Sequence, residues 1–288
     1  MNILVVGGTG FFGIPMVEKL IADGHDVTIA TRGKTKHPFQ GSTKQIIMDR
    51  TDYESVKKAL SDREFDVIID KIAFCSNDVK NLLENVRCKK YIQMSSGSVY
   101  YETQGIIKEE SFNPCEHKLV WMNFSINDYD ECKRQAERAA LEYLDISKCI
   151  FVRYPVVIGP HDYTGRLKFY VNHILEEKPI YVDDLDCPIA FISEKEAGNF
   201  IAHLVNQRVN GGINGSSKGM ISTRDIIKYI ETKTDKKAIF APNGDFAPYN
   251  GYSEKLAYDT TKAESTGFQF SNIDTWIYDL IDLYLENK

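Results

Sequence analysis

A tyrosine and a lysine four residues apart, Tyr129 and Lys133, carry the clearest chemistry in this sequence. In a helix, residues with this spacing lie on one face, one turn apart. A phenol with a pKa of about 10 is a poor base at neutral pH, but a neighbouring ammonium group stabilises the phenolate and brings that pKa toward the working range. The pair predicts a centre for general acid–base catalysis, although one such spacing arises easily by chance in a chain with 16 tyrosines.

A glycine-rich segment, Gly7-Gly8-Thr9-Gly10-Phe11-Phe12-Gly13, follows the apolar run Ile3–Val6 and precedes a predicted helix. Gly7, Gly10 and Gly13 stand where a tight turn, a close backbone approach and helix–strand packing each exclude a Cβ atom. The start of the helix then presents free N–H groups and a positive dipole end to an anion. This arrangement predicts a binding site for the pyrophosphate of a dinucleotide.

The GxxGxxG spacing is typical of the short-chain dehydrogenase/reductase superfamily, and the opening MNILVVGGTGFFG resembles its extended/atypical branch, the NAD-dependent epimerase/dehydratase family. The resemblance spans nearly the whole chain, because the strand ending in Ser95-Ser96-Gly97-Ser98-Val99-Tyr100 is similar to the family's SSxxVY segment and precedes Tyr129 and Lys133 in the expected order. It implies that Ser96 hydrogen-bonds the reacting oxygen of the substrate, that Tyr129 exchanges a proton there, and that Lys133 also binds the nicotinamide ribose. Hydride would pass between the substrate carbon and the nicotinamide. The expected activity is that of an NAD(P)-dependent oxidoreductase or epimerase acting at a secondary alcohol or ketone.

The residues at the end of the second predicted strand, Val27–Thr31, indicate which dinucleotide is bound. NAD-binding relatives place a carboxylate there to accept from the ribose 2′-hydroxyl, whereas this chain continues Thr31-Arg32-Gly33-Lys34. Arg32 and Lys34 are suited to a 2′-phosphate, so NADP(H) is favoured and NAD(H) stays open; the alternative is that both are solvated loop cations. Asp49, followed by Arg50, resembles the family's adenine-contacting aspartate segment, although an aspartate at a strand end is also an ordinary cap.

Taken together, the predicted cofactor contacts come from the glycine-rich turn, the ends of successive strands and the helix that carries the tyrosine. They are Gly7, Thr9, Gly10, Phe11, Phe12, Gly13, Thr31, Arg32, Lys34, Asp49, Arg50, Ala73, Tyr129, Lys133, Tyr154, Pro155 and Val157.

The second half of the chain is expected to bind the substrate. Arg153–Pro160 resembles the family's strand-to-loop segment leading into the substrate-binding part, Phe191–Ala197 its return to the first domain, and Leu256–Phe268 its closing motif. Sugar-nucleotide epimerases of the family usually place an arginine shortly before the closing motif to clamp a diphosphate, but no arginine follows Arg224 here. Arg166 is the predicted substrate-binding cation, with a surface role as its alternative. Both a sugar nucleotide and a smaller alcohol or ketone remain open as substrates.

These residues need a framework of alternating strands and helices, and the apolar runs predict one. Strands are expected at Ile3–Val6, Val27–Thr31, Gln45–Met48, Val67–Asp70, Tyr91–Met94 and Cys149–Tyr154. Helices are expected at about Phe12–Asp23, Tyr53–Ser61 (capped by Asp52), Asp78–Asn85, Tyr129–Leu144, Arg166–Glu177, Glu194–Asn206 and Thr223–Thr232. After residue 155 the rhythm becomes less regular, with loop dipeptides such as Gly211-Gly212, and the long interval from Ser96 to Tyr129 indicates an insertion around 109–124.

The predicted fold is therefore α/β, a Rossmann-type doubly wound parallel sheet with a smaller α+β C-terminal substrate-binding part. We expect a dinucleotide-binding domain at 1–155 and a substrate-binding part at 156–288, with about 189–206 returning to the first domain.

Composition and charge bear on the class of function, the compartment and the partners of the protein. The 288 residues carry 35 Lys and Arg against 41 Asp and Glu, and the net charge of −6 argues against a generally basic nucleic-acid binder. No apolar run is long enough for a membrane span, and the six scattered cysteines show no metal-ligand spacing, so we expect a cytoplasmic protein with a small-molecule substrate and no metal. By analogy with the family a homodimer is an open alternative. A second class of function is a catalytically silent NADP-binding regulator or a relative of the chloroplast stem-loop RNA-binding proteins, which the glycine-rich opening also resembles.

Overall fold

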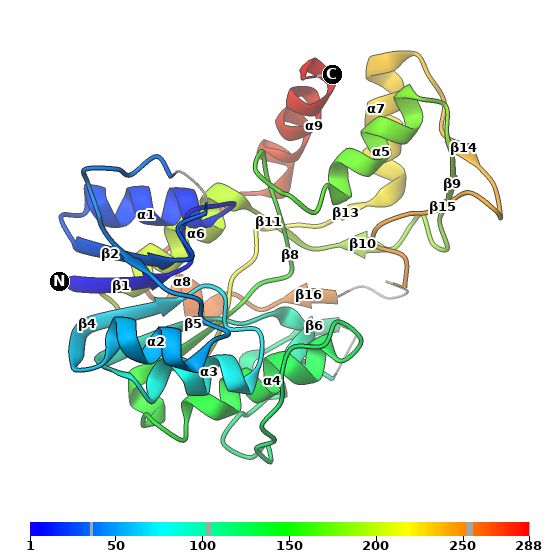
Figure 1. Ribbon diagram of the computed structural model, residues 1–288. Helices are drawn as coiled ribbons and strands as arrows, with labels where there is room; N and C mark the ends of the chain where they lie inside the picture. Colours follow the sequence, from blue (N-terminus) through cyan, green and yellow to red (C-terminus); the bar gives the residue numbers. More distant parts are fainter. Residues whose placement is uncertain (35–36, 102–104, 252–255, 288) are drawn as a thin grey trace.

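The computed structural model describes residues 1–34, 37–101, 105–251 and 256–287. Within these ranges, seven parallel strands form a central sheet in the order β12-β7-β5-β4-β1-β2-β3 (Figure 1). Their bounds are β1 Asn2–Val6, β2 Asp26–Thr31, β3 Lys44–Ile47, β4 Arg63–Asp70, β5 Val86–Met94, β7 Cys149–Arg153 and β12 Gly211–Asn214. Since the chain winds outward from β1 in both directions, the predicted doubly wound fold is confirmed.

Helices cover both faces of this sheet (Figure 1). On one face lie α1 (Gly13–Ala22) and α6 (Glu194–Leu204), and on the other α2 (Tyr53–Leu60), α3 (Ser76–Leu83) and α4 (Tyr129–Ala140). Because both faces are covered, β1 is apolar from Ile3 to Val6, and these four residues are fully buried. No helix in the part of the chain that the structure describes combines the length and apolar character needed to cross a membrane.

Local signals in the sequence explain where several helices begin. Asp52 caps α2, its carboxylate accepting the backbone N–H of Glu54 at 3.1 Å, as predicted. Ser193 caps α6 in the same way by accepting the N–H of Glu196. Pro15 lies in the first turn of α1, where the missing N–H leaves no helical hydrogen bond unmade.

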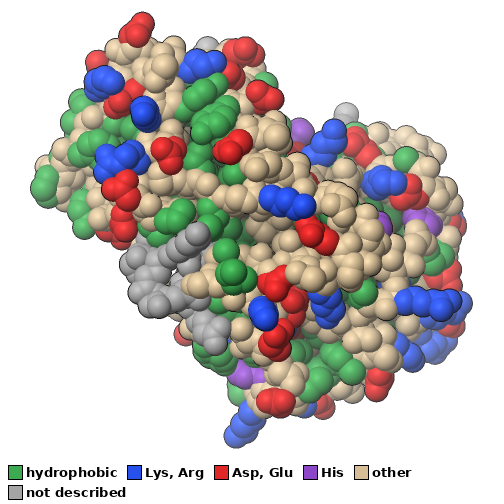
Figure 2. Space-filling view, turned by 180° about the vertical axis from the view of Figure 1, so that it is seen from behind, with side chains coloured by type: hydrophobic (Ala, Val, Ile, Leu, Met, Phe, Trp, Pro, Cys, Tyr) green, Lys and Arg blue, Asp and Glu red, His purple; other side chains and the backbone are tan. Residues whose placement is uncertain are grey.

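The second half of the chain builds a smaller lobe around its own apolar core. Its helices are α5 (Arg166–Leu175), α7 (Thr223–Thr234) and α9 (Ile277–Glu286), and its strands include β9 (Pro179–Tyr181), β14 (Ile239–Phe240) and β15 (Asp245–Phe246). Figure 2 shows hydrophobic side chains on the surface of this lobe. Strands β9, β14 and β15 carry the exposed Tyr181, Ile239, Phe240 and Phe246.

Short strand pairs lie outside the seven-stranded sheet, and one of them joins a segment of the second half to a segment of the first. Strand β8 (Val156–Ile158) pairs with β11 (Phe191–Ser193), β10 (Pro188–Ile189) with β13 (Ile221–Ser222), and β16 (Leu256–Tyr258) with β6 (Gly105–Ile107). The short helix α8 (Thr261–Glu264) follows β16. We propose that the boundary between the dinucleotide-binding domain and the substrate-binding part lies at residue 155, between β7 and β8.

The prediction of a loop at Gly211-Gly212 is wrong, because these residues open β12, which pairs in parallel with β7. Glycine is required at 212 because a Cβ there would lie 2.5 Å from Cζ of the buried Arg153. The segment that returns to the sheet therefore extends to Asn214, beyond the expected end near residue 206.

The long interval before Tyr129 is filled by an irregular segment that packs on α3 and α4. The Ser76 hydroxyl, at the start of α3, donates to the carbonyl of Val120 and accepts from the N–H of Met122, each at 2.8 Å. On α4, the Gln135 amide accepts from the N–H of Val120 at 2.7 Å and donates to the carbonyl of Lys118. These bonds bring the segment to the edge of the sheet where the predicted site residues lie.

Candidate dinucleotide and active site

The glycine-rich turn connects β1 to α1 at the carboxyl edge of the sheet. Gly7 has a φ of +94°, and a Cβ on Gly13 would lie 2.7 Å from Cα of Gly8, so turn and helix pack backbone against backbone. No side chain caps α1, and the N–H groups of Phe11 and Phe12 have no acceptor among the described residues. These open donors at a helix N-terminus fit an anion such as a pyrophosphate.

Beside this turn lies a cavity of about 740 Å³, within the usual range for small-molecule sites. Seven of the predicted cofactor residues line it: Gly7, Thr9, Thr31, Arg32, Lys34, Asp49 and Arg50. The other predicted cofactor residues, all of them described, do not line it: Gly10, Phe11, Phe12, Gly13, Ala73, Tyr129, Lys133, Tyr154, Pro155 and Val157.

At the end of the cavity formed by the residues after β2 and β3, two cations lie near one carboxylate. Arg32 and Lys34 follow β2 and are exposed, and their charges contribute to holding the pKa of Asp49 below its ordinary value. The larger cause is Thr51, whose hydroxyl and backbone N–H both donate to Oδ1 of Asp49, at 2.7 and 3.0 Å. Asp49 is therefore an ionised acceptor fixed at this end of the cavity.

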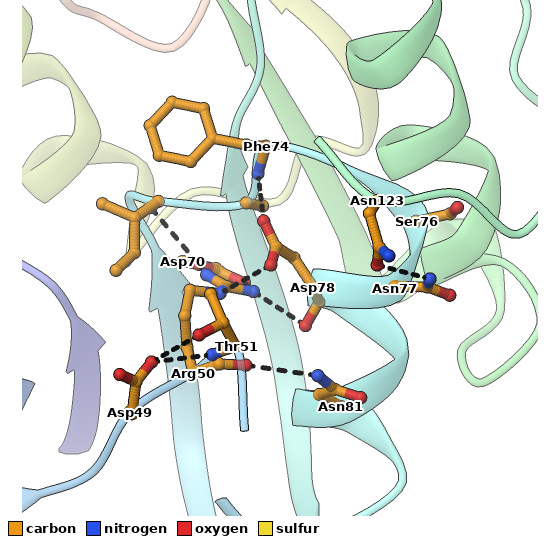
Figure 3. A network of polar contacts seen from close by, with 12 residues as sticks. Asp49, Arg50, Thr51, Asp70, Phe74, Ser76, Asn77, Asp78, Asn81 and Asn123 are labelled. Carbon is orange, nitrogen blue, oxygen red and sulfur yellow. Dashed lines mark hydrogen bonds and ion pairs between the residues drawn. The ribbon is translucent and has the colours of Figure 1, made fainter. Parts of the chain in front are cut away.

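Arg50 is held in a buried polar network (Figure 3). Its guanidinium donates to both carboxylate oxygens of Asp70 and to the carbonyl of Asp78, and it is also paired with the Asp78 carboxylate. The cofactor contact predicted for Arg50 stays a prediction: the residue lines the cavity, while its guanidinium is paired with the carboxylates of Asp70 and Asp78. Through these pairs Arg50 ties the start of α3 to the end of β4.

The sequence prediction missed part of the cavity wall. Phe74, Asn77 and Asp78 line it from the β4–α3 connection, and Asn123 and Phe124 from the inserted segment. The side-chain amide of Asn77 donates to Oδ1 of Asn123 at 2.8 Å, which joins the two walls (Figure 3). The residues of the β4–α3 connection could have been predicted, because ligands of doubly wound sheets lie at the carboxyl ends of the strands.

Tyr129 and Ser96 come together at the end of β5. Ser96 follows that strand and accepts the N–H of Ser98, whereas Tyr129 is the first residue of α4. Burial raises the pKa of the Tyr129 phenol, while its hydrogen bond with the Ser96 hydroxyl and the positive charge of Arg166 act in the opposite direction. The structure therefore brings three predicted site residues, Ser96, Tyr129 and Arg166, into one electrostatic group.

Lys133 is buried one turn further along α4. Its ammonium group donates to the carbonyls of Ala73 and Met94, at 2.8 and 2.9 Å, and lies 5.2 Å from the ring centre of Phe74. Burial lowers its pKa to about 8, although the carboxylates of Asp70 and Glu137 act to raise it. An ammonium group has three donors, so one remains for a ligand at the junction of β4 and β5.

The chain from the end of β7 to the start of α5 holds further predicted contacts. Arg166 donates to the Thr164 hydroxyl at 2.9 Å and to the carbonyl of Val157 at 3.0 Å, and so anchors the segment containing Pro155 and Val157. Tyr154 stays a predicted cofactor contact, and its polar groups already have partners within the protein. Its phenol donates to the carbonyl of Ala197 and its own carbonyl accepts from Gly97, so both oxygens are used inside the protein.

The sequence model of the NAD dependent epimerase/dehydratase family matches residues 3–214, from β1 to the end of β12. The chain belongs to this family. The matched segment contains the glycine-rich turn, Ser96, Tyr129 and Lys133, and it ends where the last strand of the sheet ends. The predicted family membership is therefore confirmed.

Solved structures with similar folds include epimerases. A putative epimerase from Burkholderia cenocepacia is 18% identical, with a TM-score of 0.76 over 99% of this chain and 98% of that one. The UDP-glucose 4-epimerase of Thermus thermophilus, solved with NAD, is 18% identical, with a TM-score of 0.71 over 99% of each chain. At this identity the likeness establishes the fold alone.

One relative is similar in sequence. The chloroplast stem-loop binding protein of 41 kDa b from Arabidopsis thaliana is 28% identical over 198 residues, which are 63% of this chain. The match covers 48% of the relative, so this chain spans about half of its length.

Proposed function

We propose that this protein is a nicotinamide-dependent oxidoreductase or epimerase that acts at a secondary alcohol or ketone. The observation that carries the proposal is the meeting of Ser96 and Tyr129 at the end of β5, with Lys133 buried one turn along α4. Family membership supports a nicotinamide cofactor. When bound, that cofactor accepts or supplies the hydride.

The chain's own residues would bind, orient and move a proton. Ser96 donates its hydroxyl hydrogen to the substrate oxygen, and Tyr129 gives a proton to that oxygen in reduction or takes it in oxidation. Lys133, already fixed by two carbonyls, uses its third donor on the ribose hydroxyls. The backbone N–H groups of Phe11 and Phe12 would receive the pyrophosphate.

For the dinucleotide, we propose a preference for the 2′-phosphorylated form. Arg32 and Lys34 are exposed at the carboxyl end of β2 and line the cavity, and no carboxylate stands at that strand end to accept from a ribose 2′-hydroxyl. The similar solved structures that contain NAD favour the dinucleotide without the 2′-phosphate. Measured affinities for both dinucleotides distinguish the two alternatives.

Replacing Arg32 with serine should weaken NADPH binding about tenfold or more, the usual effect of losing one charge-assisted hydrogen bond, and leave NADH binding nearly unchanged. Dissociation constants measured by nicotinamide fluorescence test this, with Lys58→Ser on α2 as a surface control. A wild-type protein that binds NADH more tightly than NADPH would contradict the preference.

The substrate itself is proposed only by class. Two of the hydrogen-bonding groups of Arg166 are used by Thr164 and Val157, which leaves part of its guanidinium for a substrate anion. Relatives solved with UDP-sugars make a sugar nucleotide one alternative, and a smaller alcohol or ketone is the other. A panel of UDP-sugars and simple ketones, assayed for oxidation of the reduced cofactor and for epimerised product, would distinguish them.

The stem-loop binding relative supports a second candidate function, RNA binding without catalysis. With a net charge of −6, the protein should show no binding to a stem-loop RNA even at low salt, because such binding rests on neutralising phosphates. A gel-shift or anisotropy titration over several salt concentrations measures this. Salt-dependent binding by a protein that turns over no substrate would favour the alternative.

A further inference from the structure

Lys71 follows Asp70 at the end of β4 and turns to the opposite face of the sheet. Its backbone N–H continues the pairing with β1 by donating to the carbonyl of Val6. Successive side chains of a strand point to opposite faces, and Asp70 bonds Arg50 on the α2–α3 side. Lys71 therefore lies on the side of α1 and α6.

There the Lys71 side chain passes beside the glycine-rich turn. Its Cβ lies 3.6 Å from the position that a Cβ on Gly7 would take. Its ammonium nitrogen lies 4.2 Å from the ring centre of Phe12, the residue that precedes α1 and whose own N–H is open. The ammonium group thus stands close to the donors that fit a pyrophosphate.

The ammonium group has no hydrogen-bond acceptor or ion-pair partner among the described residues. The one carboxylate whose charge acts on it is that of Glu194, at the start of α6. Both oxygens of Glu194 are already engaged by His161, one by its backbone N–H and the other by its ring. A partly buried cation without a partner, next to an anion-binding turn, calls for an anionic ligand.

We propose that Lys71 is a dinucleotide-binding residue that supplies the positive charge opposite the pyrophosphate. The inference rests on the proposed function, to which it adds a specific cation for the cofactor. It assigns Glu194 and His161 a positioning role, because the carboxylate keeps the ammonium group charged when the site is empty.

This assignment has a consequence for pH. Burial lowers the pKa of Lys71 to about 8, against the opposing charge of Glu194. A pyrophosphate prefers the protonated amine, so binding should be tightest below pH 8 and weaken as the pH rises through that value. Lys133 has a similar pKa and also lies in the site, so its titration would remain after Lys71 is removed.

The test is the dissociation constant of NADH from pH 7 to 9.5, followed by nicotinamide fluorescence; its pyrophosphate does not titrate there. Lys71→Met should weaken binding about tenfold or more at pH 7 and much less at pH 9.5, as expected for one lost charge-assisted contact. Glu194→Gln should keep the pH dependence but shift its midpoint downward. Lys89→Met, which removes an exposed lysine paired with Asp66, serves as the control.

Unchanged NADH affinity in Lys71→Met at pH 7 would overturn the assignment. So would an equal loss at both ends of the pH range, which would point to a structural role for Lys71. Adenosine, which lacks the pyrophosphate, should bind the variant and the wild type alike. Failure of the proposed function would give a different result. A catalytically silent protein would still bind NADH more weakly after Lys71→Met, but it would turn over no substrate.

Discussion

Tyr129→Phe should lower the turnover number about 10²- to 10⁴-fold and leave dinucleotide affinity within about twofold of the wild type. The substitution removes one oxygen at the first residue of α4, where the phenol meets Ser96, and keeps the ring that packs against Phe124. The proton that must reach or leave the substrate oxygen then has no donor in the right place. The rate with a substrate found by the panel, and the affinity for NADPH and NADH, are the two measurements.

The chain provides a matched control for this substitution. Tyr53 and Lys57 have the same spacing, Tyr53 is also the first residue of its helix, and the Lys57 ammonium lies 5.9 Å from its ring centre. Tyr53→Phe should leave turnover unchanged because Tyr53 begins α2 and is not part of the group formed by Ser96, Tyr129 and Arg166. Equal rates for Tyr129→Phe and the wild type would remove Tyr129 from the mechanism.

The pH profile adds a second readout. Burial raises the pKa of Tyr129, so ketone reduction, which needs the protonated phenol, should persist to high pH and fall above that pKa. Alcohol oxidation needs the phenolate and should instead rise with pH over the same range. Because Arg166 lowers the pKa of Tyr129, Arg166→Met should move both profiles to higher pH.

The sequence was sufficient for the framework because its signals are local and repeated. Runs such as Ile3–Val6 are apolar on both faces, as a covered parallel strand must be, and Asp52 carries its own capping acceptor. The C-terminal helix α9 was not predicted, although Ile277, Leu280 and Ile281 follow a helical period and are buried.

The direction of individual side chains could not be predicted in the same way. Arg50 follows Asp49 in a segment that resembles a cofactor contact, yet its guanidinium is paired with Asp70 and Asp78, which are distant in sequence. Lys71 was not predicted as a site residue, because no local sequence pattern shows which face of the sheet carries the glycine-rich turn. In both cases the deciding partner is a tertiary neighbour.

Arg153 shows what such a tertiary partner is worth in stability. Its guanidinium and the Glu137 carboxylate are both fully buried and form two hydrogen bonds, at 2.9 and 2.7 Å. The guanidinium also donates to the Tyr100 phenol and to the carbonyls of Glu109 and Phe112. It therefore joins β7 and α4 to the segment that follows the Ser96 turn.

Arg153→Met should reduce the free energy of unfolding by about 3–5 kcal/mol, because it leaves the Glu137 carboxylate buried without its cation. The Ser95 hydroxyl, which donates to Glu137 at 2.5 Å, would be its remaining partner. Since Ser95 adjoins Ser96, we also expect the variant to lose activity before it unfolds. Urea denaturation followed by circular dichroism measures the change in stability.

Two further variants separate the buried charge from the lost contacts. Adding Glu137→Leu to Arg153→Met should restore part of the stability, because the double variant buries no unpaired charge. Arg224→Met removes an exposed arginine whose ion pair with Asp186 is open to solvent, and it should leave stability close to that of the wild type. If Arg153→Met destabilises the protein no more than Arg224→Met, the buried pair does not hold these elements together. The structure predicts a clear difference in stability between the two variants, because only Arg153→Met leaves a carboxylate buried without its cation.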